Sequence, residues 1–228
     1  MIEGLYYYTR EEIEQKVEQI FGMWFPEYLV KSKIFAWERF CKKIGEEYNV
    51  KVTINANLGN AASGFPILGA FSLSPREIFI DVSIRYDKGF LVVLAHEIGH
   101  LILHRKLKFN PDSDNGLTDT LKTLSNPKSV ESDNEIIEWQ ANAFACSVLM
   151  PRGTFYKAML RAQHVLGLKQ KLVIQVTNHP DSIAEYNNIA NEMAKWCFVP
   201  QRAIKIRLHE LGLVRGPGAV EGHISSYL

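Results

Sequence analysis

Cysteine is scarce in this sequence: there are three among 228 residues, Cys41, Cys146 and Cys197. They are odd in number, far apart and form no CxxC pair, which excludes a disulfide framework and a zinc ribbon. Long apolar runs are absent too, since stretches such as Phe90 to Ala95 are much shorter than the roughly 20 residues that span a bilayer. The first ten residues lack the basic start and apolar run of a secretory signal. We therefore expect a cytoplasmic protein with no membrane partner.

The sequence also has no large excess of charge of either sign. Lys and Arg total 26 against 25 acidic residues, so the formal net charge of +1 creates no general attraction to nucleic acid or to an anionic membrane. Hydrophobic residues make up 46% and charged residues 22%, which is the range of ordinary globular chains rather than disordered ones. The length is enough for one well-buried domain with a small second lobe.

The segment from Lys88 to Arg105 has apolar residues at spacings of three and four and no proline, which predicts a helix. It carries the pattern HExxH, with two histidines, His96 and His100, one turn apart on the same face. Two imidazoles in this arrangement can bind one zinc ion, and Glu97 beside the first ligand can act as general base for water. Gly99 lies inside this helix, where glycine is unfavourable, and it indicates close approach of another backbone.

A catalytic zinc site needs a third protein ligand and an open position. A metzincin would supply a third histidine where this chain has Lys106, so that class is excluded. A second buried helix is predicted from Asp133 to Leu149, after a long polar segment, Phe109 to Ser129, that is typical of a surface loop. Glu138 on that helix is the best candidate for the third ligand.

Several neighbouring polar residues leave alternatives open. Glu131, Asp133 and Glu135 are weaker candidates because acidic residues at a helix start commonly serve the helix dipole. Asn142 could hydrogen-bond a ligand or could be a satisfied core amide. His104 lies one turn beyond His100, and as a fourth ligand it would close the site. We favour instead contacts with carbonyl groups or a place lining the cleft, and, with Asn142, a role in supporting the metal ligands.

Two motifs carry a resemblance to a known family. They are AHEIGHLILH from Ala95 to His104 and EWQANAFACSVLMP from Glu138 to Pro151, and IFIDVSI from Ile78 to Ile84 is similar to the strand that precedes the site helix. Together these segments resemble the ImmA/IrrE family of zinc metallopeptidases. The resemblance extends over roughly residues 67–156.

The resemblance implies that His96, His100 and Glu138 bind zinc and that Glu97 is the catalytic base. Mn²⁺ or another divalent ion could occupy such a site. Family members cleave helix-turn-helix repressors and so switch on stress or transfer genes, which implies a regulatory protein as substrate. Two alternatives stay open: a non-catalytic DNA- or protein-binding regulator with a structural metal site, and a regulatory component that is inactive until a partner binds.

The resemblance also suggests where a substrate lies, because the family is thought to hold its peptide as an added strand. Ile78, Phe79 and Ile80 form the expected edge for that strand; the alternative is an internal strand that directs Phe79 into the core. In the C-terminal region, residues 183–196 and 199–214 resemble a helix-turn-helix. Its basic residues could contact phosphates, although packing on the catalytic core is favoured; they are Arg202, Lys205, Arg207 and Arg215.

The predicted fold class follows from these elements. It is α+β, with a mainly helical, zincin-like metallopeptidase core that contains a small antiparallel sheet. The core is assigned to residues 1–160, and a C-terminal helical extension packed on it to residues 161–228. Helices are expected between Thr9 and Asn49, and strands at Val52 to Ile54 and Ile78 to Val82.

Overall fold

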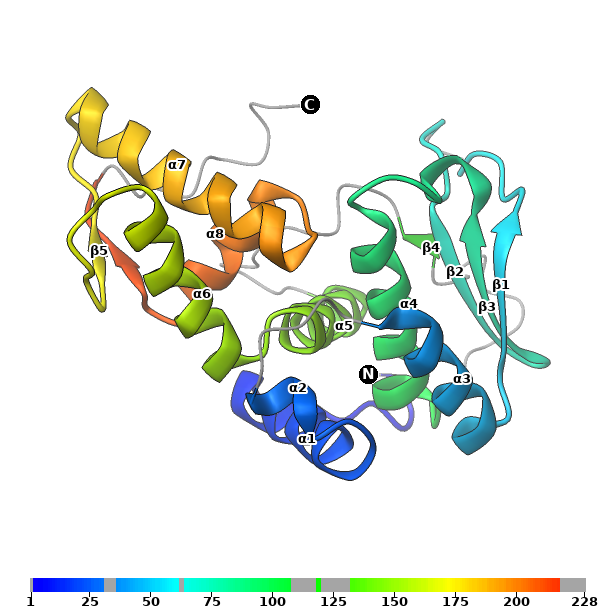
Figure 1. Cartoon of the computed structure of the whole chain (residues 1–228). Coiled ribbons are helices and arrows are strands. Elements are labelled where there is room, and N and C mark those ends of the chain that lie inside the picture. Colours follow the sequence, from blue (N-terminus) through cyan, green and yellow to red (C-terminus); the bar gives the residue numbers. More distant parts are fainter. Residues whose placement is uncertain (1, 31–35, 62–63, 108–117, 120–131, 218–228) are drawn as a thin grey trace. The chain divides into compact units, whose positions relative to one another are not determined.

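The computed structural model describes residues 2–30, 36–61, 64–107, 118–119 and 132–217 (Figure 1). The chain forms two compact units: unit 1 is Met1–Trp24 with Ala36–Leu149, and unit 2 is Phe25–Phe35 with Met150–Leu228. The fold is α+β and mainly helical, as the sequence predicts. The predicted division after residue 160 falls inside helix α6, Arg152–Val165, whereas the sequence passes from unit 1 to unit 2 between Leu149 and Met150.

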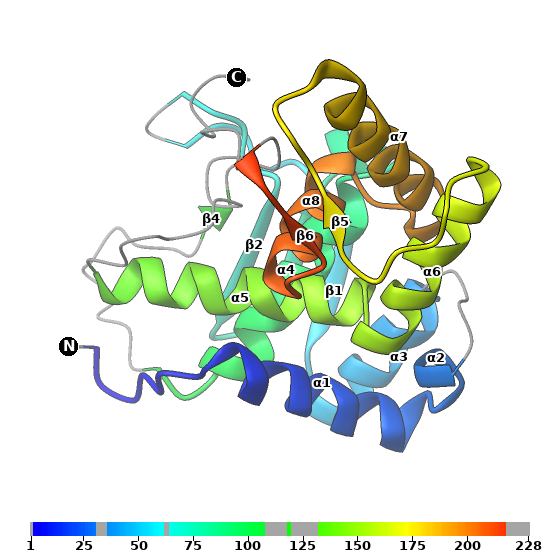
Figure 2. The same ribbon diagram turned by 90° about the vertical axis from the view of Figure 1, so that its left-hand side faces the viewer.

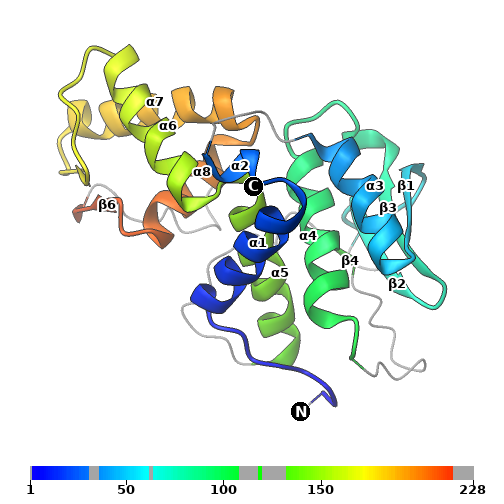
Figure 3. The ribbon, with the colours of Figure 1, turned by 60° about the horizontal axis from the view of Figure 1, so that its bottom comes forward.

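Unit 1 is built in layers around helix α4, Phe90–His104. One side of α4 contacts the sheet and another contacts α5, Asp133–Leu149, which in turn contacts α1, Arg10–Trp24. Figure 2 shows α1 running beside α5, and Figure 3 shows α4 between α5 and the sheet. Every residue of α4 except Ile102 is buried, because neighbours cover the helix on all sides.

The sheet of unit 1 is mixed, and the prediction of an antiparallel sheet is wrong. Its strands are β1 (Lys51–Ala56), β2 (Gly69–Leu73), β3 (Arg76–Asp81) and β4 (Thr118–Asp119), in the order β1-β3-β2-β4. The tight β2–β3 hairpin inserts β3 between β1 and β2, so that β1 and β3 run parallel while β2 is antiparallel to both β3 and β4. The order of strands, and not their residue pattern, creates the parallel pair.

The position of β3 overturns the predicted substrate edge at Ile78, Phe79 and Ile80. This strand pairs with β1 along one side and with β2 along the other, so neither side is open to an added peptide. It is the internal strand of the alternative interpretation. Ile78 and Ile80, both fully buried, supply its core contacts, whereas Phe79 is only half-buried on the opposite face.

Local sequence signals explain where α5 begins and how closely it approaches α4. Ser132 and Glu135 form a capping box: Glu135 N–H donates to Ser132 Oγ at 3.3 Å, and Ser132 N–H donates to Glu135 Oε2 at 3.0 Å. The helix ends just before Pro151. At Gly99 of α4, an added Cβ would lie 3.1 Å from Ala141 Cα, so glycine permits the close helix contact that the sequence predicts.

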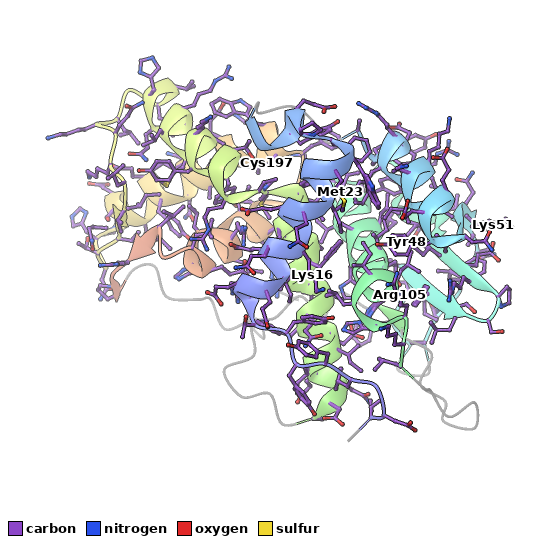
Figure 4. The ribbon with its side chains drawn as sticks, turned by 90° about the horizontal axis from the view of Figure 1, so that it is seen from below. Lys16, Met23, Tyr48, Lys51, Arg105 and Cys197 are labelled. Carbon is purple, nitrogen blue, oxygen red and sulfur yellow. The ribbon has the colours of Figure 1, made fainter. Side chains whose placement is uncertain are left out.

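One flanking α-helix and a short 3-10 helix, Val82–Ile84, complete the described part of unit 1. Helix α3, Trp37–Tyr48, contacts β1. Arg105, just after α4, places its guanidinium 5.1 Å from the centre of the ring of Tyr48, the last residue of α3; both residues are labelled in Figure 4. The predicted surface loop at residues 109–129 lies outside the described residues, apart from the two that form β4.

Unit 2 contains α2 (Glu27–Val30), α6, α7 (Pro180–Cys197) and α8 (Gln201–Glu210), with β5 (Ile174–Gln175) parallel to β6 (Val214–Arg215). Arg207 is buried in it and donates from Nε to the Met150 carbonyl at 3.2 Å, beside Glu210. Lys205 lies over the Tyr186 ring. Arg207 therefore stabilises the interior of unit 2, which speaks against the less favoured possibility that this residue contacts phosphates.

Among the described residues, no helix combines the length and the apolar character needed to cross a bilayer.

Candidate metal centre

Three side chains from two helices converge in unit 1. His96 and His100 of α4 place their Nε2 atoms 2.9 Å apart. Glu138 of α5 places Oε2 at 3.2 Å from His96 Nε2 and Oε1 at 3.6 Å from His100 Nε2. These three residues are the group that, among the described residues, could hold a metal ion. The structure thus brings together the three predicted ligands across 38 positions of sequence (138 − 100 = 38).

The spacing of these donors fits a small divalent cation. Bonds of about 2.0–2.1 Å to a tetrahedral zinc ion separate neighbouring ligand atoms by about 3.3–3.4 Å. The observed separations of 2.9, 3.2 and 3.6 Å lie on both sides of that value. Two imidazole nitrogens and one carboxylate are also a donor set that zinc and related divalent ions accept.

Burial tunes the chemistry of the histidines. His96 and His100 are 0% and 1% exposed, whereas the side chain of Glu138 is 19% exposed. Burial, reinforced by the neighbouring His96 and His104, lowers the pKa of His100 well below 6.5. His100 is therefore neutral near pH 7 and has a lone pair available for a metal.

Glu97 is fully buried on α4, directly after His96. Its carboxylate lies against the backbone of Gly69 at the start of β2, where an added Cβ would be 2.5 Å from Glu97 Oε1. Sequence reasoning missed Gly69. The available signal was a glycine in an otherwise β-rich region, which indicates close approach of a neighbouring group. Its role beside Glu97 depends on tertiary packing.

Each ligand histidine has a polar partner at its other ring nitrogen. Asn142 Oδ1 lies 2.8 Å from His96 Nδ1, which agrees with the supporting role that the sequence left open. His104 Nδ1 lies 3.0 Å from His100 Nδ1, and His104 Nε2 lies 2.9 Å from Gln140 Oε1. His104 is 1% exposed, and burial is the main cause that lowers its pKa to about 4.

The place of His104 agrees with a role in supporting a metal ligand, but its contacts differ from the expected ones. Its ring contacts His100 and Gln140 inside unit 1 rather than backbone carbonyls or an open cleft. Sequence reasoning missed Gln140, whose amide also donates to the Tyr6 carbonyl at 2.9 Å. Gln140 falls on the apolar face of α5 between Ile137 and Phe144, and a buried amide at such a position could have drawn attention to it.

The competing acidic residues near the start of α5 have other partners. Asp133 accepts hydrogen bonds from Ile2 N–H and from the Tyr7 hydroxyl, and Glu135 belongs to the capping box. Glu131 lies outside the described residues. Of these acidic residues, Glu138 alone joins the histidines in the group that the described structure forms.

Comparison with known proteins identifies the family. No curated protein matches the chain. Residues 71–195, more than half of the 228, match the peptidase M78 family, described as the IrrE N-terminal-like domain. The match contains both helices of the candidate metal centre. The chain therefore belongs to the peptidase M78 family and is a peptidase of the metal-dependent type.

Proposed function

We propose that this protein is a zinc-dependent endopeptidase in which His96, His100 and Glu138 bind the metal and Glu97 transfers protons. The observation that carries the proposal is the convergence of one carboxylate and two buried imidazoles from α4 and α5. Bound zinc would act as a Lewis acid and would lower the pKa of a coordinated water toward about 7. Mn²⁺ or another divalent ion remains an alternative occupant.

In this proposal Glu97 accepts a proton from the attacking water while the water oxygen bonds to the peptide carbonyl carbon. It then donates that proton to the leaving nitrogen as the C–N bond breaks. The products are a carboxylic acid and an amine, and Glu97 regains its charge. The buried surroundings of Glu97 exclude bulk water and strengthen its electrostatic interactions.

The proposed substrate is a helix-turn-helix repressor or a similar regulatory protein, and the proposed location is the cytoplasm. The resemblance of the two helix motifs to ImmA/IrrE peptidases supports the substrate class. The three cysteines, Cys41, Cys146 and Cys197, support a reducing compartment, since none is in a disulfide. A wider role in transcription regulation and stress response follows from the same substrate class.

A non-catalytic regulator with a structural metal site is the second candidate. A closed structural zinc site uses four protein ligands. The group found among the described residues has three, and its carboxylate is partly exposed, so the open catalytic arrangement is favoured. The two candidates differ in their need for Glu97, because a structural site has no use for a general base.

The experiment combines metal content with cleavage of a helix-turn-helix repressor supplied as purified protein. Wild-type protein should contain about one zinc per chain and cleave, whereas Glu97→Gln should retain zinc and lose cleavage. His96→Ala and Glu138→Gln should lose most of the zinc, while Glu135→Gln, an acidic control on the same helix, should keep it. A wild-type chain that takes up no zinc would overturn the proposal. Cleavage that survives in Glu97→Gln would overturn the role of that residue.

A further inference from the structure

A line of hydrogen bonds connects the candidate metal centre to the N-terminal segment. His100 Nδ1 lies 3.0 Å from His104 Nδ1, and His104 Nε2 lies 2.9 Å from Gln140 Oε1. Gln140 Nε2 lies 2.9 Å from the backbone carbonyl of Tyr6. His100, His104 and Gln140 are each no more than 1% exposed, so water does not compete for these bonds.

The Tyr6 carbonyl, at the end of this line, determines which group donates and which accepts in every hydrogen bond of the line. The Tyr6 carbonyl can only accept, so the amide nitrogen of Gln140 faces it and the amide oxygen faces His104. That oxygen must accept from His104 Nε2–H, which leaves His104 Nδ1 as an acceptor because the buried ring is neutral. His100 Nδ1 must then carry the proton.

We propose that His104 is a positioning residue that holds His100 in the tautomer with its proton on Nδ1, and that the Tyr6 carbonyl sets this orientation through Gln140. The remaining nitrogen of His100, Nε2, is the atom that faces His96 and Glu138. Its lone pair is thus directed to the metal before any ion binds. This inference rests on the proposed metal site and adds a residue that fixes one of its ligands.

Contacts on both sides of Tyr6 hold the N-terminal segment against α5 and the end of α4. Ile2 N–H donates to Asp133 Oδ2 at 2.7 Å, and the Tyr7 hydroxyl donates to Asp133 Oδ1 at 2.8 Å, which attaches the segment to the start of α5. Gly4 lies against the carbonyl of Lys106, just after α4, where an added Cβ would be 2.7 Å from that oxygen. Tyr6 lies between these contacts and outside the matched residues 71–195. A segment beyond the family match therefore orients a ligand within it.

Two substitutions of His104 separate the hydrogen bond from the packing. His104→Phe keeps the ring volume but leaves His100 Nδ1–H without its acceptor. His104→Asn is smaller and leaves a cavity, yet its amide oxygen can occupy the place of Nδ1 and accept the same bond. Relative to wild type, we expect zinc affinity to fall about 10- to 100-fold in His104→Phe and by a smaller factor in His104→Asn. A packing role alone predicts the opposite order.

The measurements are zinc dissociation constants by chelator competition and histidine tautomers by ¹H–¹⁵N NMR of the full chain. Val148→Ala, a buried truncation at the far end of α5, is the stability control and should leave zinc affinity unchanged. In metal-free wild type we expect protons on His100 Nδ1 and His104 Nε2. A proton on His104 Nδ1, or zinc affinity in His104→Phe equal to or above that of His104→Asn, would overturn the proposal. Correct tautomers in a protein that binds no zinc would instead overturn the metal site and leave the hydrogen-bond line standing.

Discussion

The backbone of Gly69 on β2 lies against the carboxylate of Glu97 on α4, and no side chain fits between them. A Cβ at residue 69 would be 2.5 Å from Glu97 Oε1 and 2.6 Å from Val93 Cγ1. These separations are far below van der Waals contact, so even one methyl group would displace both side chains. The first strand residue beside α4 thus defines the position of the proposed general base.

Gly69→Ala should therefore impair catalysis more than metal binding. A displaced Glu97 should lower kcat/KM for peptide cleavage about 10- to 100-fold, because a shift of about 1 Å is enough to lose a proton-transfer geometry. Zinc content should stay close to one per chain. Gly22→Ala is the matched control, since an added Cβ at Gly22 meets nothing within 4 Å. Unchanged kcat/KM in Gly69→Ala would show that Glu97 tolerates the displacement or is not the base.

Gly99→Ala should destabilise unit 1 although alanine favours a helix. Replacing glycine by alanine inside a helix stabilises the helix by about 1 kcal/mol. The added Cβ would meet Ala141 Cα and the Ala141 carbonyl oxygen, both at 3.1 Å, and these backbone atoms move only if α5 moves. Overpacking of this kind typically costs about 1–3 kcal/mol, so we expect a lower free energy of unfolding and weaker zinc binding.

Denaturant unfolding and chelator competition check this expectation, with Gly153→Ala of α6 as the control because its added Cβ has open space. A higher free energy of unfolding in Gly99→Ala than in wild type would mean that α4 and α5 can move apart without loss of stability.

Replacement of Asn142 should weaken zinc binding through His96. The Asn142 side-chain oxygen lies 2.8 Å from His96 Nδ1 and accepts its proton when Nε2 faces the metal. Asn142→Ala should lower zinc affinity about 10- to 100-fold, whereas Asn142→Asp retains an acceptor and should bind zinc nearly as well as wild type. Chelator competition on the three proteins measures the difference. Equal affinities would assign Asn142 to packing alone.

Asp81 should make the stability of unit 1 depend on pH. Burial by itself would raise the pKa of Asp81, but hydrogen bonds from Leu58 N–H at 2.8 Å and Ser83 N–H at 2.9 Å outweigh it and lower the pKa below 3.8. A lowered pKa in the folded state means that this stabilisation is fully present above the ordinary pKa and is lost as pH falls through the folded value.

Asp81→Asn should accordingly reduce the free energy of unfolding by about 1–3 kcal/mol near pH 7, and the difference from wild type should shrink below pH 3.8. Unfolding curves between pH 7 and about pH 3 test this sign. Asp181→Asn, at an exposed carboxylate in unit 2, serves as the comparison. A difference that grows on acidification would contradict the assignment.

The sequence predicts the helices of the metal centre well because their signals are local. The capping box at Ser132 and Glu135 and the proline at 151 define α5 as Asp133–Leu149, the range predicted. The apolar spacing around HExxH predicts residues 88–105, and α4 is Phe90–His104. The relative position of Glu138 is also predictable, since one side of a capped helix must bury its apolar residues.

The sheet could not be derived in the same way. Strand β2, Gly69–Leu73, has few large apolar residues and was not separated from the glycine-rich segment around it. Without β2, no pattern shows that β3 lies inside the sheet, which is why its edge was misassigned. The hydrogen bond from Gln140 to the Tyr6 carbonyl could not be predicted either. Every residue has a backbone carbonyl, so the sequence does not show which one accepts the bond.

The burial of every residue of α4 except Ile102 has a consequence for the motions that unit 1 allows. A helix enclosed by the sheet and α5 can expose its amides only when those neighbours separate, so its hydrogens should be among the last of unit 1 to exchange with deuterated solvent. Exchange at the partly exposed Glu138 region of α5 should be faster. The two histidines would thus lie in the part of unit 1 that unfolds locally most slowly. A bound ion could leave past Glu138 without local unfolding of α4.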